Sequence, residues 1–208
     1  PLTIREVGRR ARLKLLNESI YNCISPKVLI AGCGTGQQSI EAGSRFQNSK
    51  IVAIDLSVAS LSYAIRKTNE FGLKNIEYMQ ADILDLYDLG QKFDLIECCG
   101  VLHHMDNPFK GWQVLTNCLN PGGLMKVALY SKSARGLINK VRQEISQLGF
   151  NADPASIKGF REMVIDSEEY HHKAVRSFAD FYCLSELRDL LFHVKEHQFT
   201  IPEIEHML

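Results

Sequence analysis

The sequence has no excess of charge of either sign and no long apolar run. Lys plus Arg and Asp plus Glu both number 24, so no overall field favours nucleic acid. No apolar segment approaches the roughly 20 residues that span a bilayer, so no membrane partner is expected. With 45% hydrophobic residues over 208 positions, the composition favours a cytoplasmic protein with one well-buried domain and an appendage. The absence of an initiator methionine indicates an excised or processed segment.

Cysteine is present but forms no pattern that predicts disulfides or a metal. We expect reduced thiols in a cytosol for all six: Cys23, Cys33, Cys98, Cys99, Cys118 and Cys183. Two histidine patterns are also weak. His171 and His172 are adjacent, and neighbouring side chains on a helix diverge by about 100°, so we expect no shared metal. His193 and His197 have the spacing of an inverted zinc-peptidase motif, but too little chain follows to supply a third ligand.

The most informative feature is a glycine loop that follows a short apolar run. Residues 28–31 read Val-Leu-Ile-Ala and predict a fully buried strand. Gly32, Gly34 and Gly36 then remove every second Cβ, which allows positive φ and a close approach of a ligand to the backbone. The polar run that starts at Gln37 predicts a helix whose free N–H groups point at that ligand. The loop therefore predicts the first unit of a nucleotide-binding α/β fold.

The spacing of the loop and two later acids narrow the ligand. The loop reads Gly-x-Gly-x-Gly and lacks the extra residue of the dinucleotide fingerprint, which disfavours NAD. Asp55, followed by Leu56, ends the second apolar run and is placed to accept hydrogen bonds from ribose hydroxyls. Asp82 and Ile83 follow the third run, where an adenine amino group would lie. The expected ligand is an adenosine without a pyrophosphate.

These motifs resemble the class I S-adenosylmethionine-dependent methyltransferases from about Val28 to Tyr130. Five elements arrive in order: the glycine loop, Asp55, the segment 80–84, the segment 93–104 and the Pro-Gly-Gly turn that leads into residues 124–129. The resemblance implies a Rossmann-like, doubly wound, mainly parallel sheet with flanking helices and S-adenosyl-L-methionine as cofactor. It also implies a methyl transfer by in-line displacement, in which positioning does most of the work.

The resemblance carries site residues over position by position. The loop residues would line the methionine part, Asp55 and Leu56 the ribose, Asp82 and Ile83 the adenine, and Cys99 and Gly100 the sulfonium. The cofactor-binding set is therefore Gly32, Cys33, Gly34, Gly36, Gln37, Asp55, Leu56, Asp82, Ile83, Cys99 and Gly100. His103 and His104 follow the fourth strand, where a base would take the proton that a nucleophile loses, or where both would simply pack.

One residue departs from the family pattern. The family usually has an acid near the end of the first strand, and Ile30 stands in that position. The contact to the amino group of the cofactor is weakened, unless Gln37 or Gln38 compensates.

The chain is expected to have three parts. An amphipathic helix from about Leu2 to Tyr21 belongs to residues 1–27, and its basic residues Arg5, Arg9, Arg10, Arg12 and Lys14 read as a solvated face. Residues 28–130 form the cofactor-binding core. Residues 131–208 are mostly helical, with helices near 134–148, 157–163 and 185–191 and a capped start at Thr200. We expect this part to be a lid or substrate wall, followed by further strands beyond residue 208 or by none.

The methyl acceptor is not readable from the core motifs. The Asn/Asp-Pro-Pro-Tyr/Phe tetrad of amide and base methylation is absent, since Cys99-Gly-Val-Leu102 stands at that place, which favours a small-molecule acceptor. The tail from Asp180 to Glu203 resembles bacterial methyltransferase domains that are sometimes fused to tetratricopeptide repeats, although these residues show no repeat. Two alternatives stay open. One is a catalytically idle methyltransferase-like binding module, and the other, less favoured, is an NAD(P)-dependent oxidoreductase.

Overall fold

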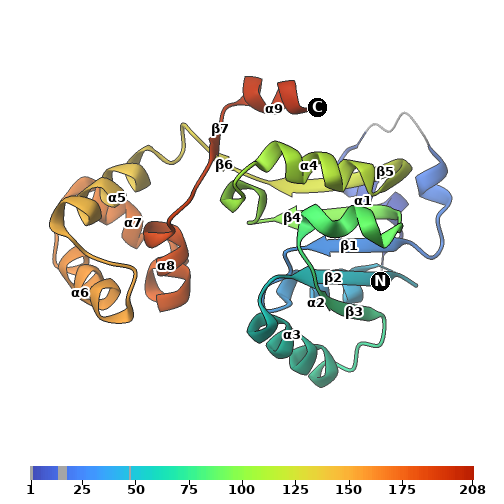
Figure 1. The fold of residues 1–208 in the computed structure, drawn as a ribbon, viewed down its shortest axis with the longest axis horizontal. Helices are drawn as coiled ribbons and strands as arrows, with labels where there is room; N and C mark the ends of the chain where they lie inside the picture. The colour runs from blue at the N-terminus through green and yellow to red at the C-terminus, as the bar shows by residue number, and fades with distance from the viewer. Residues whose placement is uncertain (1, 14–17, 47) are drawn as a thin grey trace. The chain divides into compact units, whose positions relative to one another are not determined.

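The chain folds into two units. The structure is a computed structural model that describes residues 2–13, 18–46 and 48–208. One unit spans Pro1–Leu129 and the other Tyr130–Leu208 (Figure 1). Each unit has its own hydrophobic core.

The first unit is built on a five-stranded parallel sheet with the order β3-β2-β1-β4-β5 (Figure 1). Its strands are β1 (Lys27–Ala31), β2 (Lys50–Asp55), β3 (Ile76–Gln80), β4 (Phe93–Cys99) and β5 (Leu119–Ala128). The chain runs outward from β1 to β3 and then returns to place β4 on the other side of β1, so the strand order reverses between β1 and β4. Ligands of such sheets bind at this reversal, outside the carboxyl ends of the strands. The predicted Rossmann-like α/β fold is confirmed.

Helices cover both faces of the sheet because β1 is apolar on both sides. Val28 and Ile30 pack into one core with α1 (Ile4–Arg10), α2 (Gln37–Arg45) and α3 (Val58–Glu70). Leu29 and Ala31 pack into the other core with η2 (Ile83–Leu89), η3 (Leu102–His104) and α4 (Pro108–Asn117). These four apolar residues of β1 are fully buried. The sheet is therefore doubly wound, as a continuous apolar strand requires.

Two local predictions were wrong in extent. The leading helix does not run from Leu2 to Tyr21: α1 ends at Arg10, Arg12 has a φ of 53°, and a separate 3₁₀ turn, η1, covers Glu18–Asn22. Lys14 lies outside the described residues. The Pro-Gly-Gly turn does not precede the fifth strand but forms an irregularity inside β5, where the register with β4 shifts and Gly122 has a φ of 80°.

The second unit is mostly helical. Its elements are β6 (Tyr130–Ser131), α5 (Gly136–Leu148), α6 (Pro154–Ile165), α7 (Tyr170–Arg176), η4 (Ala179–Tyr182), α8 (Leu184–Phe192), β7 (Gln198–Phe199) and α9 (Ile201–Met207). Apolar residues three and four apart on α5, α6 and α8 meet in one core. Thr200 and Glu203 form the predicted capping box of α9. Among the described residues, no helix is both long and apolar enough to cross a membrane.

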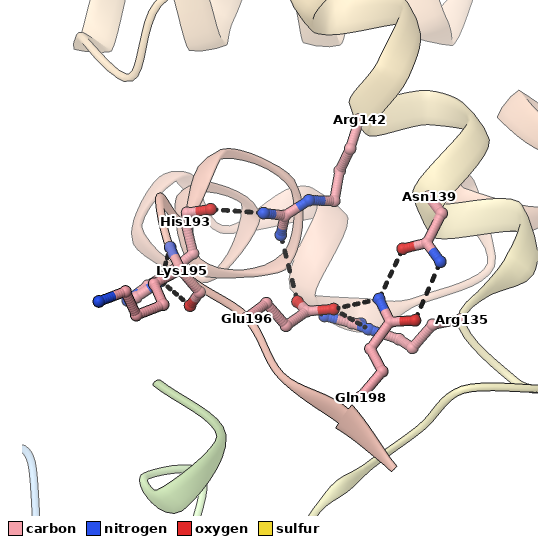
Figure 2. Close-up of polar contacts among 7 residues, drawn as sticks. All are labelled: Arg135, Asn139, Arg142, His193, Lys195, Glu196 and Gln198. Carbon is pink, nitrogen blue, oxygen red and sulfur yellow. Dashed lines mark hydrogen bonds and ion pairs between the residues drawn. The ribbon is translucent and has the colours of Figure 1, made fainter. Parts of the chain in front are cut away.

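A buried polar cluster joins the two ends of the second unit. Glu196, whose side chain is 2% exposed, accepts hydrogen bonds from Arg135 and Arg142 of the α5 region (Figure 2). Gln198 exchanges two hydrogen bonds with Asn139 and donates a third to Glu196 (Figure 2). Gln198 also belongs to β7, which forms a short parallel pair with β6. Residues 193–197 are not helical. His193 and His197 therefore lack the helix that the inverted zinc-peptidase motif requires.

Candidate functional site

The glycine loop turns sharply at the carboxyl end of β1. The N–H groups of Gly32 and Cys33 both donate to the Ile54 carbonyl, at 2.9 and 2.8 Å. Gly32 has a φ of 76°, and a Cβ at this position would lie 2.1 Å from Cγ2 of Val101. Only glycine fits both the conformation and the space, so the loop backbone lies directly against the segment that follows β4.

Asp55 ties this loop to the start of α3. Its Oδ2 accepts the Gly34 N–H at 2.7 Å, and its Oδ1 accepts the Ser57 N–H at 2.9 Å. An ionised carboxylate has about four lone-pair positions, so two positions remain for hydroxyl donors. The structure therefore fixes the orientation of Asp55 before any ligand arrives.

A cavity of about 570 Å³ opens beside Asp55 at the strand-order reversal. It brings together six residues that the sequence predicted: Gly32, Asp55, Leu56, Asp82, Ile83 and His104. Leu56 lines it while remaining 65% exposed, and Ile83 lines it from the buried core. Asp82 caps η2 by accepting the Leu84 N–H at 2.9 Å through one oxygen. The cavity thus combines the carboxylates of Asp55 and Asp82 with apolar walls.

Six other predicted cofactor residues are not among those that line this cavity: Cys33, Gly34, Gly36, Gln37, Cys99 and Gly100. Gly36, with a φ of 91°, is the N-cap of α2, and a Cβ there would lie 2.6 Å from Cβ of Ala64. Gln37 donates to Glu41 along the exposed face of α2 at 3.2 Å. Burial and then the charge of Asp55 raise the pKa of the Cys33 thiol to about 12, so this thiol stays protonated.

The two histidines after β4 differ in position. His103 is 1% exposed and packs within the protein, whereas His104 lines the cavity. Their rings meet edge to face with centroids 4.3 Å apart. Of the pair, His104 is therefore the one that can meet a ligand.

Sequence reasoning missed three polar residues at the cavity: Asp106, Asn107 and Lys110. Asn107 accepts the Lys110 N–H at 3.1 Å and so caps α4, with Pro108 in its first turn. The Asn-Pro pair is a signal of a helix start, and it was available in the sequence. It marks a helix N-terminus at the cavity, which the motif comparison did not include.

The position that departs from the family pattern is buried. Ile30 is fully buried and pairs in register with Glu97 of the neighbouring β4. The Glu97 side chain is 4% exposed and forms ion pairs with Arg45 at 3.3 Å and Lys126 at 3.7 Å. An acid thus stands one strand away from the expected position, and it is neutralised by two cations.

Comparison with known proteins agrees with this geometry. Residues 29–125 match the family described as "Methyltransferase domain". An uncharacterized protein of Synechococcus sp. is 33% identical over 124 residues, which are 59% of this chain and 30% of that protein. The mitochondrial ubiquinone biosynthesis O-methyltransferase of Dictyostelium discoideum is 28% identical over 147 residues, which are 62% of this chain and 45% of that protein. The chain therefore spans less than half of each of these relatives.

Solved structures share the fold. PKMT2 from Rickettsia typhi superposes with a TM-score of 0.70 and 22% identity over 88% of this chain and 38% of that one. A second structure of that protein, in complex with AdoHcy, gives a TM-score of 0.68. The likeness continues past Leu129, because the first unit alone supplies only 129 of the 208 residues. The family match, the strand order and the glycine loop agree: residues 29–125 are similar to the methyltransferase-domain family and have a Rossmann-like α/β fold.

Proposed function

We propose that the first unit binds S-adenosylmethionine in the cavity beside Asp55 and that the protein transfers its methyl group to a small-molecule acceptor. The observation that carries the proposal is the convergence of Asp55 and Asp82 on one cavity with the apolar side chains of Leu56 and Ile83. These two carboxylates and apolar side chains suit an adenosine, which has hydroxyls, an amino group and an aromatic ring. The volume of about 570 Å³ is typical of small-ligand pockets.

Each of these residues has a separate task. Asp55 would accept the ribose hydroxyls through the lone pairs that its two backbone bonds leave available. Asp82 would accept the adenine amino group through its second oxygen, since Oδ1 already holds the Leu84 N–H. Gly32 lines the cavity and lets the loop backbone lie against Val101, because any Cβ there would lie 2.1 Å from Cγ2 of Val101.

The protein itself needs few chemical groups for the transfer. A sulfonium methyl group is already activated by the positive sulfur when the cofactor is bound. The chain's part is to orient both reactants in line and to exclude water. His104 lines the cavity and is the candidate to take up an acceptor proton at one of its ring nitrogens. His103, at 1% exposure, would support η3.

Support for a small-molecule acceptor comes from the sequence and from the relatives. The Asn/Asp-Pro-Pro-Tyr/Phe tetrad is absent after β4, and the net charge of zero provides no field that attracts nucleic acid. Relatives include ubiquinone biosynthesis O-methyltransferases and a probable (S)-tetrahydroprotoberberine N-methyltransferase, but also a tRNA U34 carboxymethyltransferase. A methyl-transfer assay with radiolabelled cofactor should therefore compare phenols and amines with tRNA. Labelling of tRNA alone would refute the small-molecule proposal.

The cofactor proposal is tested first by calorimetric titration. The full 208-residue chain is titrated with S-adenosylmethionine, S-adenosylhomocysteine and NADH. We expect the first two to bind and NADH not to bind, because the Gly-x-Gly-x-Gly loop lacks the dinucleotide spacing. Binding of NADH alone would indicate an oxidoreductase. Binding of S-adenosylmethionine without turnover on any acceptor would indicate an idle module.

A further inference from the structure

A second cluster of chemically active side chains lies in the Tyr130–Leu208 unit. Glu144 projects from α5, and His171 and His172 occupy the first turn of α7. Nε2 of His172 lies 2.8 Å, and Nε2 of His171 3.1 Å, from the same carboxylate oxygen, Oε2 of Glu144. The two histidines therefore do not diverge as their adjacency predicts: their ring centroids are 4.3 Å apart. The fold adds the third group, which comes from a helix 27 residues earlier in the sequence.

We propose that Glu144, His171 and His172 bind a divalent transition metal ion of the zinc type. Two imidazole nitrogens and one carboxylate are a ligand set that zinc adopts with a fourth position left for water. Imidazole donors favour zinc, cobalt or nickel over magnesium and calcium, which prefer oxygen. One potential ligand atom from each residue lies within 4.8 Å of those of the other two. A tetrahedral ion needs ligand atoms about 3.3 Å apart, so small side-chain rotations suffice.

The surroundings of His172 match those of a metal ligand. Its other ring nitrogen, Nδ1, lies 2.7 Å from Oγ of Ser167. Metal-bound histidines usually hold the second nitrogen in a hydrogen bond, which fixes the ring and the tautomer. Ser167 is itself held in place, because its carbonyl accepts from Arg176 at 3.0 Å and its Oγ accepts the Glu169 N–H at 3.2 Å. When Nε2 binds the metal, the proton moves to Nδ1 and Ser167 becomes the acceptor.

His171 has an incomplete environment without a metal. Its Nδ1 is buried and has no hydrogen-bond partner among the residues that the structure describes, and Oε2 of Glu169 lies 3.9 Å away. A buried ring nitrogen without a hydrogen-bond partner carries a desolvation cost, whether it is a donor or an acceptor. Metal binding at Nε2 would place the proton on Nδ1, and the 69% exposed Glu169 side chain can rotate to accept it. The proposal therefore gives Glu169 a task that the metal-free geometry leaves unfilled.

Charge and access also fit a bound cation. Both histidines are buried at 5% and 3% exposure, while the Glu144 side chain is 28% exposed and gives solvent a route to the cluster. Oε2 of Glu144 lies within hydrogen-bond distance of both imidazoles, so its carboxylate is placed to supply the negative charge that a cation site needs.

The test measures zinc binding by the untagged full chain in a Cys183→Ser background, which removes the exposed thiol that would compete for zinc. We expect one tightly held equivalent of Zn²⁺ after gel filtration. We also expect His172→Gln and Glu144→Gln to weaken binding at least about 100-fold, and Ser167→Ala about 10-fold or more, the loss that follows removal of a partner hydrogen-bonded to a ligand. His206→Gln makes the same chemical change at an exposed position of α9 and should leave binding unchanged.

The proposal is overturned if the chain retains no zinc, or if His172→Gln and His206→Gln bind it equally. The absorption spectrum of the cobalt-loaded chain gives a second test, because thiolate ligands produce charge-transfer bands that a site of nitrogen and oxygen ligands lacks. Such bands would assign the metal to cysteine and refute the site. Should the variants fail to fold, ¹⁵N spectra of the unaltered histidines decide. Zinc should shift two imidazoles to the Nδ1–H tautomer, and unchanged tautomers would exclude the site.

Discussion

Replacing Asp55 with alanine should weaken S-adenosylmethionine binding by more than any loss of stability explains. Asp55 already accepts the N–H groups of Gly34 and Ser57, at 2.7 and 2.9 Å. A ligand hydroxyl would add a further charge-assisted hydrogen bond, and such bonds contribute about 1.5–3 kcal/mol each. The dissociation constant should therefore rise roughly 10- to 150-fold.

The control must separate the ligand bond from the loss of the two backbone bonds. Asp153 provides it, because its Oδ1 also accepts two backbone N–H groups, those of Ala155 and Ser156, at the N-terminus of α6. Asp153→Ala removes a comparable pair of backbone hydrogen bonds at a helix N-terminus and should therefore also lower stability. It should leave S-adenosylmethionine affinity unchanged, because Asp153 lies outside the lining of the cavity.

A ligand analogue that lacks the ribose hydroxyls tests the same contact from the side of the ligand. S-adenosylhomocysteine and its 2′,3′-dideoxy form are titrated into the unaltered chain and into Asp55→Ala. If Asp55 holds the ribose, the analogue binds the unaltered chain weakly and loses little further affinity in the variant. Equal losses for both ligands would show that Asp55 acts only through the loop, and unchanged affinity for both would refute the ribose assignment.

Three further predictions test other parts of the structure. Gly34→Ala should cost about 1–2 kcal/mol of unfolding free energy for its positive φ alone, whereas Gly32→Ala should cost about 1–3 kcal/mol more through overpacking. Denaturant unfolding of both variants measures the difference, and equal costs would contradict the close contact at Gly32. Iodoacetamide at pH 7.5 should modify the exposed Cys183, whose pKa is lowered by hydrogen bonds from neighbouring groups, well before Cys33, whose pKa is about 12; peptide mass spectrometry reads the order, and early loss of the Cys33 thiol would be the contrary result. Burial opposes ionisation of Glu196, but hydrogen bonds and arginine charges outweigh it, so its pKa is lowered from 4.5. Its contribution to stability is therefore complete above about pH 5 and is lost as the pH falls through the lower, folded-state pKa. Glu196→Gln should reduce this loss of stability at acid pH in a pH series of unfolding measurements, and an unchanged acid dependence would contradict the prediction.

The first unit was predictable because its signals are local. A continuous apolar strand, glycines at alternate positions and an acid at the next strand end are each read within a few residues of sequence. Parallel strands then bring these segments to one edge of the sheet without further information. Hence Gly32, Asp55 and Asp82 meet at the cavity as expected. The helix start at Pro108 is equally local, but the family motif includes no residue there, so Asp106, Asn107 and Lys110 were not expected at the cavity.

Pairings between distant residues could not be read from sequence. Glu196 meets Arg135 across 61 positions and Arg142 across 54, and no local pattern at any of these positions predicts a partner. The same holds for His172, whose partner Glu144 lies 28 positions earlier. The spacing of His171 and His172 describes only their own helix, whereas the carboxylate that contacts both rings comes from α5.

Restoring the acid that the family usually has at position 30 should not improve cofactor binding in this fold. Ile30 is fully buried in an apolar core, so restoring an acid there would place a second carboxylate beside Glu97, its register partner on β4. Glu97 already draws on Arg45 and Lys126, and a second buried charge would have no cation of its own. Ile30→Asp should therefore destabilise the unit rather than improve cofactor affinity. If thermal unfolding and calorimetry instead showed a stable variant that binds S-adenosylmethionine more tightly, the isoleucine would be a loss of function and not an accommodation to the acid on the neighbouring strand.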